Sequence, residues 1–381
     1  MYNQSETACE TVDTPFEAVV HKGRCLTQRA AWRASDIVTA LGLAALLLPS
    51  WLLPERSWAP IWRSMARVPL LTSRSAVRRT GKCIGVAFGE PDRKRDEAIA
   101  RDLKAAVYEL RMQDLRAWRP GGWRPKMTLE GEDQLSVALS QGKGAILWLA
   151  PFVFNSGPTK IAIHERGYRV SHLSSPIHGY SETRFGIASL NRIRCIPEDR
   201  YLVQRIVYDR SAPSTAMRRM MSALKAGEVV SIVAVSTEGT KMVKAPIFGG
   251  RLSVAVGAPR LAGLTGAPLL PVFTVRDPKL GFRIVIEAPI EPATDLPSDA
   301  RVTAAATEFL RRSALWVRRF PEQWRAWSKW EAPGPALTQV GPATIAPAEL
   351  RRTAMPGAAT SIFWALINRL IAGFNGRLPS S

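Results

Sequence analysis

Histidine and cysteine are both scarce, with four of each among 381 residues. The four cysteines share no short spacing: Cys9, Cys25, Cys83 and Cys195. Because no CxxC pair or metal-ligand spacing is present, neither a zinc site nor a disulfide framework is predicted, and a reduced, cytosol-facing chain is favoured. Any histidine chemistry is restricted to four positions: His21, His164, His172 and His178.

Several catalytic and nucleotide-binding motifs are also absent. The chain has no G-x-S-x-G elbow, so the common Ser-His-Asp hydrolase arrangement is not predicted. It has no P-loop and no glycine fingerprint of a dinucleotide site. We therefore expect neither a metal ion nor a bound cofactor.

Acidic residues are outnumbered, with 32 Asp and Glu against 52 Lys and Arg, which leaves a net charge of +20. Such a charge predicts an anionic partner: nucleic acid, an anionic membrane surface or acidic small molecules. The 12 tryptophans are many for this length, and tryptophan near arginine is typical of lipid headgroup regions. The aromatic residues form no RNA-stacking pattern, so membrane lipid is favoured over nucleic acid.

One long apolar segment covers residues 37–53 and contains no charge. As a helix it would be about 26 Å long, which is marginal for a hydrocarbon core of roughly 30 Å. Pro49 is expected to break or kink its end. Three alternatives remain: an interfacial helix, which Trp51, Trp58 and Trp62 favour, a true membrane span, or a soluble core helix.

From residue 142 onward, apolar strands alternate with helical segments. Strands are predicted at 144–150, 168–173, 229–235, 268–275 and 282–287. Helices are predicted at 158–166, 181–190, 213–225, 254–264 and 302–319. A basic helical region, 74–126, precedes them, with apolar residues at helical spacing that indicate an ordinary surface helix. Repeated βα units predict an α/β fold whose largely parallel or mixed sheet has helices on both faces.

The chain is therefore divided into four parts. Residues 1–80 hold a polar segment and the apolar helix, and 81–330 form the α/β domain. Residues 331–360 are rich in Pro, Ala and Gly and indicate a linker. Residues 361–381 form an amphipathic helix that either docks on the body or lies in a membrane interface.

The predicted strand 229–235 runs directly into Ser-Thr-Glu-Gly-Thr-Lys at 236–241. Open α/β sheets hold ligands at the carboxyl ends of their strands. Hydroxyls, the backbone around Gly239 and the cation of Lys241 suit a phosphate group. The alternative is a plain strand exit with a solvated lysine.

Five segments carry a family resemblance: KAGEVV at 225–230, PIFGG at 246–250, GAPRLA at 257–262, TGAPLLPVF at 265–273 and FPEQWRAW at 320–327. In order and spacing they are similar to the bacterial lipid A lauroyl/myristoyl acyltransferases of the lysophospholipid acyltransferase superfamily, over about 140–330. The resemblance implies a glycerophospholipid acyltransferase-like mixed sheet. It also implies an inner (cytoplasmic) membrane location, with the active domain on the cytoplasmic side.

The implied activity is transfer of a fatty acyl group from an acyl carrier protein or coenzyme A thioester to a lipid or lipid-like acceptor. An acidic carrier protein would suit the basic chain. Glu238, Gly239, Thr240 and Lys241 resemble the superfamily block that binds the phosphate-bearing acceptor. Arg184 is a second candidate for binding phosphate, against the alternative of a solvated surface arginine.

The family places a catalytic histidine at a strand end and an acid five positions later, where this chain has Pro151 and Ser156. Neither residue is a base at neutral pH, so the family mechanism does not carry over to these positions. His178 with Glu182 is the candidate substitute pair, against the alternative of a loop histidine beside a solvated glutamate.

Two other histidines have plainer expectations: His172 falls in a predicted strand and is expected to be packed there, and His164 falls in a predicted helix and is expected on its surface. The loss of the family pair leaves a second function open. In it, a catalytically altered or inactive member binds lipid or acyl carrier without transfer.

Overall fold

The computed structural model describes residues 18–20, 28–68, 73–235, 241–278 and 281–333. The predicted C-terminal helix at 361–381 and nearly all of the predicted linker lie outside the described residues. The same holds for Glu238, Gly239 and Thr240.

The core of the molecule is a seven-stranded mixed sheet, which confirms the predicted α/β architecture. Its strand order is β2 (Met127–Glu130), β10 (Gly281–Ile286), β9 (Leu269–Asp277), β3 (Ala145–Leu149), β6 (Val229–Val233), β4 (Val170–Ser174), β5 (Gln204–Val207). Only β9 and β10 pair antiparallel, and every other pairing in this sheet is parallel. The central strands are almost wholly apolar because helices cover both of their faces.

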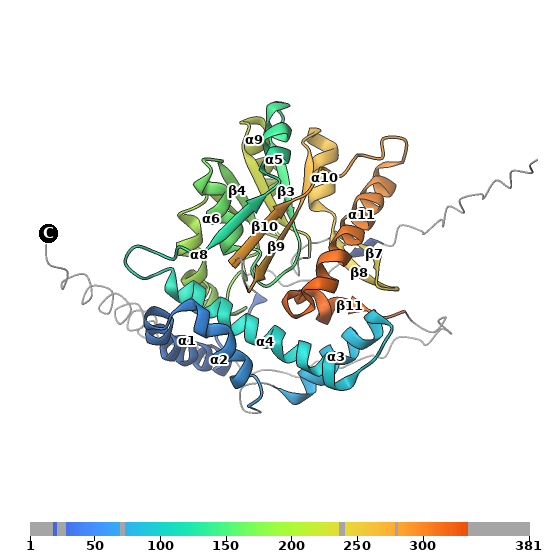
Figure 1. Cartoon of the computed structure of the whole chain (residues 1–381). Helices are drawn as coiled ribbons and strands as arrows, with labels where there is room; N and C mark the ends of the chain where they lie inside the picture. The colour runs from blue at the N-terminus through green and yellow to red at the C-terminus, as the bar shows by residue number, and fades with distance from the viewer. Residues whose placement is uncertain (1–17, 21–27, 69–72, 236–240, 279–280, 334–381) are drawn as a thin grey trace, which may run out of the picture.

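Helices pack against the sheet along the whole domain (Figure 1). They are α5 (Glu132–Ser140), α6 (Gly157–Glu165), α9 (Pro213–Lys225), α10 (Gly257–Thr265) and α11 (Ser298–Arg319). The predicted helix at 213–225 has the bounds that the sequence indicated. Each helix buries an apolar stripe, so sheet and helices share one large core.

A second, four-stranded sheet has the order β1 (Ala18–Val20), β7 (Lys241–Ile247), β8 (Gly250–Ala255), β11 (Trp330–Glu331). The hairpin β7–β8 was not predicted, and the expectation of a helix from residue 254 was wrong at its start. Burial alternates along β8, which is the period of a half-buried strand, and α10 begins only at Gly257. The turn between β7 and β8 holds Phe248 and Gly249 at φ 53° and 71°.

Four helices precede the sheet: α1 (Ala34–Leu52), α2 (Trp58–Met65), α3 (Arg74–Phe88) and α4 (Arg93–Arg116). They lie together below the sheet in Figure 1. Helix α4 buries nine of its residues between the other helices and the domain, so it is an internal support rather than the ordinary surface helix that was predicted.

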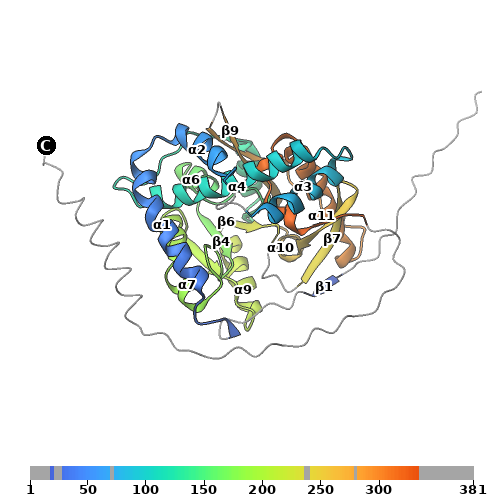
Figure 2. The same cartoon turned by 90° about the horizontal axis from the view of Figure 1, so that it is seen from below.

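The predicted apolar helix is α1, and it continues through Pro49 to Leu52. Viewed from below, it lies beside α4 and α7 (Arg184–Ala188) (Figure 2). The indole of Trp51 donates to the carbonyl oxygen of Leu115 at 3.0 Å, which ties the helix to the end of α4. Val38 and Leu41 are exposed, and only 22% of the most apolar 18-residue stretch of α1 is buried. By length and composition alone, α1 is apolar enough to cross a membrane.

Candidate active site

The carboxyl ends of β3, β4 and β6 meet at a cavity of about 540 Å³. These three strands are parallel, so their ends reach the same edge of the sheet. Pro151 and Ser156 line the cavity after β3, Ser175 lines it after β4, and Val235 lines it after β6. The sheet edge that was predicted to bind a ligand therefore has a cavity.

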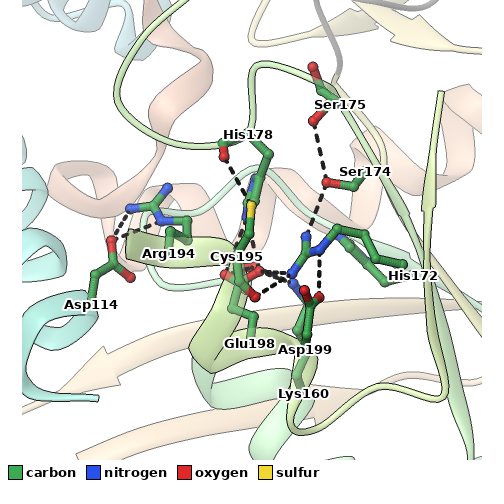
Figure 3. A network of polar contacts seen from close by, with 12 residues as sticks. Asp114, Lys160, His172, Ser174, Ser175, His178, Arg194, Cys195, Glu198 and Asp199 are labelled. Atoms are coloured by element: carbon green, nitrogen blue, oxygen red, sulfur yellow. Dashed lines mark hydrogen bonds and ion pairs between the residues drawn. The ribbon is translucent and has the colours of Figure 1, made fainter. Parts of the chain in front are cut away.

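His178 lies on the wall of this cavity, in the loop between β4 and α7. Its Nε2 atom is 3.0 Å from Oε2 and 3.3 Å from Oε1 of Glu198 (Figure 3). Glu198 belongs to α8 (Arg192–Asp199), whereas Glu182, the expected partner, is exposed. The structure thus pairs His178 with a carboxylate, but corrects which residue supplies it.

Helix α8 and Glu198 were missed because nothing local marks them. The segment has few apolar residues and contains Pro197, which disfavours a helix interior. The pair joins residues 20 positions apart through tertiary packing, so no spacing rule could have found it.

The loop that carries His178 is fixed at several points. The side-chain oxygen of Asn191 accepts hydrogen bonds from the backbone N–H groups of Tyr180 and Ser181, at 2.6 and 2.9 Å. A Cβ atom on Gly179 would lie 2.7 Å from the Cα atom of Asn191, so this close approach requires glycine.

A second anchor comes from α1. The carboxylate of Asp36 accepts hydrogen bonds from the hydroxyls of Ser181 and Thr183, at 2.6 and 2.8 Å. Asp36 is itself buried, although it belongs to the apolar N-terminal helix. The position of His178 therefore depends on contacts with α1 and with the chain just before α8.

Glu198 is the centre of a buried polar network (Figure 3). Its carboxylate is 2.5 Å from Nζ of Lys160 and 2.9 Å from a guanidinium nitrogen of Arg205. It also accepts a hydrogen bond from the hydroxyl of Ser156 at 2.8 Å, and Lys160 donates to that hydroxyl at 2.8 Å. A carboxylate therefore contacts Ser156, the position where the family pattern has its acid.

These contacts set the charge states of the pair. Burial by itself would raise the pKa of Glu198, but the Lys160 cation, the His178 hydrogen bond and the Arg205 cation hold that pKa well below its usual value. Burial lowers the pKa of His178 to about 4 despite the nearby carboxylate. At neutral pH Glu198 is ionised and the imidazole is neutral.

Only one tautomer of the neutral His178 ring is compatible with the hydrogen bond to Glu198. Because the ionised carboxylate of Glu198 only accepts hydrogen bonds, Nε2 of His178 carries the proton. Nδ1 then presents a lone pair, and no hydrogen bond or ion pair to Nδ1 is formed within the described ranges. His178 thus has the protonation pattern of a general base oriented by a carboxylate.

The other two described histidines match their predictions. His172 is buried in β4, with Nδ1 2.8 Å from the hydroxyl of Ser231, and burial lowers its pKa well below 6.5. It also lines the cavity, with its ring centroid 6.3 Å from that of His178. His164 is exposed on α6.

Cations surround the cavity. Arg194 forms an ion pair with Asp114 at 2.6 Å, and Arg260 forms one with Asp299 at 2.9 Å. Lys241, a predicted substrate residue, is exposed at the start of β7 and lines the cavity. Arg184, the other predicted cation, is exposed at the start of α7, and the described lining of the cavity does not include it. In the part of the chain that the structure describes, no group of three or more His, Cys, Asp or Glu side chains is arranged to hold a metal ion.

Comparison with known families supports the predicted resemblance. Residues 194–329 match the family described as bacterial lipid A biosynthesis acyltransferase. A comparison with curated proteins finds no match. The matched stretch contains Glu198 but neither Pro151 nor Ser156, and the family supports a general acyltransferase function. The chain therefore resembles the lipid A biosynthesis acyltransferases over the part that supplies the carboxylate of the His178 pair.

Proposed function

We propose that the protein transfers a fatty acyl group from an acyl thioester to a hydroxyl group of a lipid or lipid-like acceptor, with His178 as the general base. The observation that carries this proposal is the His178–Glu198 pair on the wall of a cavity at the strand ends. The donor thioester belongs to an acidic acyl carrier protein or to coenzyme A, and the net charge of +20 favours docking of either.

The chemistry requires one proton to move twice. Nδ1 of His178 takes the proton of the acceptor hydroxyl while that oxygen attacks the thioester carbonyl carbon. The tetrahedral intermediate then expels the thiolate, which receives the proton from the imidazolium, leaving an ester and a free thiol. Glu198 orients the ring through Nε2 and stabilises the imidazolium between these steps.

The low pKa of His178 makes it a weak base, and the reactivity of the donor offsets this. A thioester is already activated toward attack, so holding both substrates in one cavity contributes much of the rate enhancement. Glu198, which Lys160 and Arg205 keep ionised, already raises the pKa of His178 against the effect of burial.

The proposed location is the cytoplasmic face of the inner membrane. Helix α1 exposes Val38, Leu41 and Leu52 on the side away from the domain, and this apolar surface suits a lipid phase. The acceptor would then reach the cavity from the membrane, while the carrier protein arrives from the aqueous side.

The test is transfer of an acyl chain from an acyl-carrier-protein thioester to a lysophospholipid, followed by release of free thiol. His178→Gln should lower the rate about 10²- to 10⁴-fold, the usual contribution of a general base. Binding of the lysophospholipid should persist. His164→Gln is the matched control because His164 is exposed on α6. A rate in His178→Gln equal to that of the control would sink the assignment.

The second candidate is a member that binds lipid or acyl carrier without transferring the chain. It is favoured by Pro151 and Ser156, which replace the pair of the family pattern. The same assay separates the two functions: saturable lysophospholipid binding by the unsubstituted chain, with no thiol release above the uncatalysed rate, supports the second.

A further inference from the structure

Two cations that have no role in the proposed mechanism line the cavity beside His178. Arg325 and Lys329 are the first and last residues of the short 3-10 helix η4 (Arg325–Lys329). Both contribute to the wall that also contains His178 and Pro151.

The backbone around Arg325 is held firmly. Its N–H donates to the carbonyl oxygen of Pro151 at 2.9 Å, and the preceding Trp324 forms a bridge with Phe152. Trp324 and Trp327 are fully buried and pack edge to face at 4.7 Å. Helix η4 is thereby fastened to the strand end where the family pattern has its histidine.

Arg325 and Lys329 differ from the two other arginines of the cavity in their ion pairing. Arg194 and Arg260 form ion pairs with aspartates. Within the described ranges, neither the guanidinium of Arg325 nor the ammonium of Lys329 has a hydrogen bond or an ion pair. Arg325 is solvent-accessible and lines the cavity, so its charge is reachable by a ligand.

Desolvation and neighbouring cations disfavour the charged forms of Arg325 and Lys329. Although the Arg325 side chain is exposed at the cavity, desolvation by the surrounding protein and then the charge of Arg194 lower its pKa to about 10. Burial, and then the charge of Arg325, lower the pKa of Lys329. Partly desolvated cations placed near one another are stabilised when an anion enters between them.

We propose that Arg325 and Lys329 form a subsite that binds a phosphate group of a substrate next to His178. The planar fork of a guanidinium matches two phosphate oxygens, and an ammonium adds a point charge. Lys241 lines the same cavity and extends the positive surface. The phosphate belongs either to the acceptor lipid or to the phosphopantetheine arm of the donor. This identification of the ligand rests on the proposed function, whereas the subsite itself does not.

Equilibrium binding to the full chain in detergent tests the subsite without requiring turnover. Two pairs of probes differ only in phosphate: lysophosphatidate against monoacylglycerol of the same chain, and 4′-phosphopantetheine against pantetheine. Arg325→Gln should weaken binding of a phosphate-bearing probe about 10- to 100-fold, the range for a charge-assisted hydrogen-bonded contact. Lys329→Gln should weaken it less, and Arg325→Lys should recover part of the loss because the charge remains.

Lys225→Gln is the matched control, since it removes one positive charge from an exposed position on α9. Loss confined to lysophosphatidate supports an acceptor phosphate, and loss confined to 4′-phosphopantetheine supports a donor phosphate. Equal changes within both probe pairs, or a loss no larger than that of Lys225→Gln, would overturn the subsite. Phosphate selectivity without any acyl transfer would leave the subsite in place and refute the proposed function instead.

Discussion

Lowering the pH from 7 to 5 should destabilise the protein through His178. Burial holds its pKa at about 4 in the folded state, against 6.5 for an unperturbed histidine. Between these two values the unfolded chain binds a proton that the folded chain does not. The stabilising contribution is therefore complete above pH 6.5 and is lost progressively as the pH falls toward 4.

The magnitude follows from the two pKa values. At pH 5 the unfolded ring is almost fully protonated, whereas only about a tenth of the folded rings are. Since one pKa unit corresponds to 1.36 kcal/mol, His178 should contribute about 2 kcal/mol to the fall in the free energy of unfolding between pH 7 and pH 5. His172, whose pKa burial also lowers, adds to the total fall.

Urea denaturation, followed by tryptophan fluorescence at both pH values, measures this difference. His178→Gln should lack about 2 kcal/mol of the pH dependence. Glu198 does not titrate between pH 7 and pH 5, because Lys160 and Arg205 hold its pKa well below its usual value. His172 also titrates low, but it is present in both proteins. The same pH dependence in both proteins would refute a buried, neutral His178, and with it the protonation pattern on which the proposed base depends.

Three further predictions concern the same site. The acid limb of kcat/KM against pH should fall near pH 4 rather than near 6.5, because the free enzyme must have His178 neutral; a midpoint at 6.5 contradicts its burial. Asp36→Asn should slow transfer and cost about 1–3 kcal/mol of stability, since two loop hydroxyls lose a charged acceptor; unchanged single-turnover rates and unfolding curves would exclude this anchoring. Lys160→Met should cost about 3 kcal/mol in urea denaturation, the lower end for a broken buried ion pair because Arg205 still contacts Glu198; no loss would show that this pair contributes nothing.

Much of the fold was predictable because apolar periodicity is a local signal. The central strands β3 and β6 are nearly continuous apolar runs. Helix α9 begins at Pro213 and ends just before Gly227, and both residue types commonly mark helix ends. The hairpin β7–β8 was missed because both strands are short, because Met242 and Val243 interrupt the alternation of β7, and because the turn has no Asn-Gly or Asp-Gly signal.

The site was predictable only in part. His178 stood out because histidine is scarce, and the strand end was expected to hold a ligand. The carboxylate of Glu198, the buried Lys160 and the cations of η4 reach the site through tertiary contacts. Lys160 illustrates the limit, since a lysine in a short helix is ordinarily solvated, yet this one is buried against Glu198.

The replacement of the family acid by Ser156 is consistent with this tertiary arrangement. General base chemistry requires a histidine and a carboxylate at one place in space, and does not require them to share one segment of chain. Here the carboxylate comes from α8 and lies 2.8 Å from the hydroxyl of Ser156. An acid at position 156 would set two carboxylates against each other, and one of them would be forced to bind a proton. The hydroxyl of Ser156 instead donates a hydrogen bond to Glu198. The serine that replaces the acid of the family pattern is therefore compatible with a carboxylate supplied by α8.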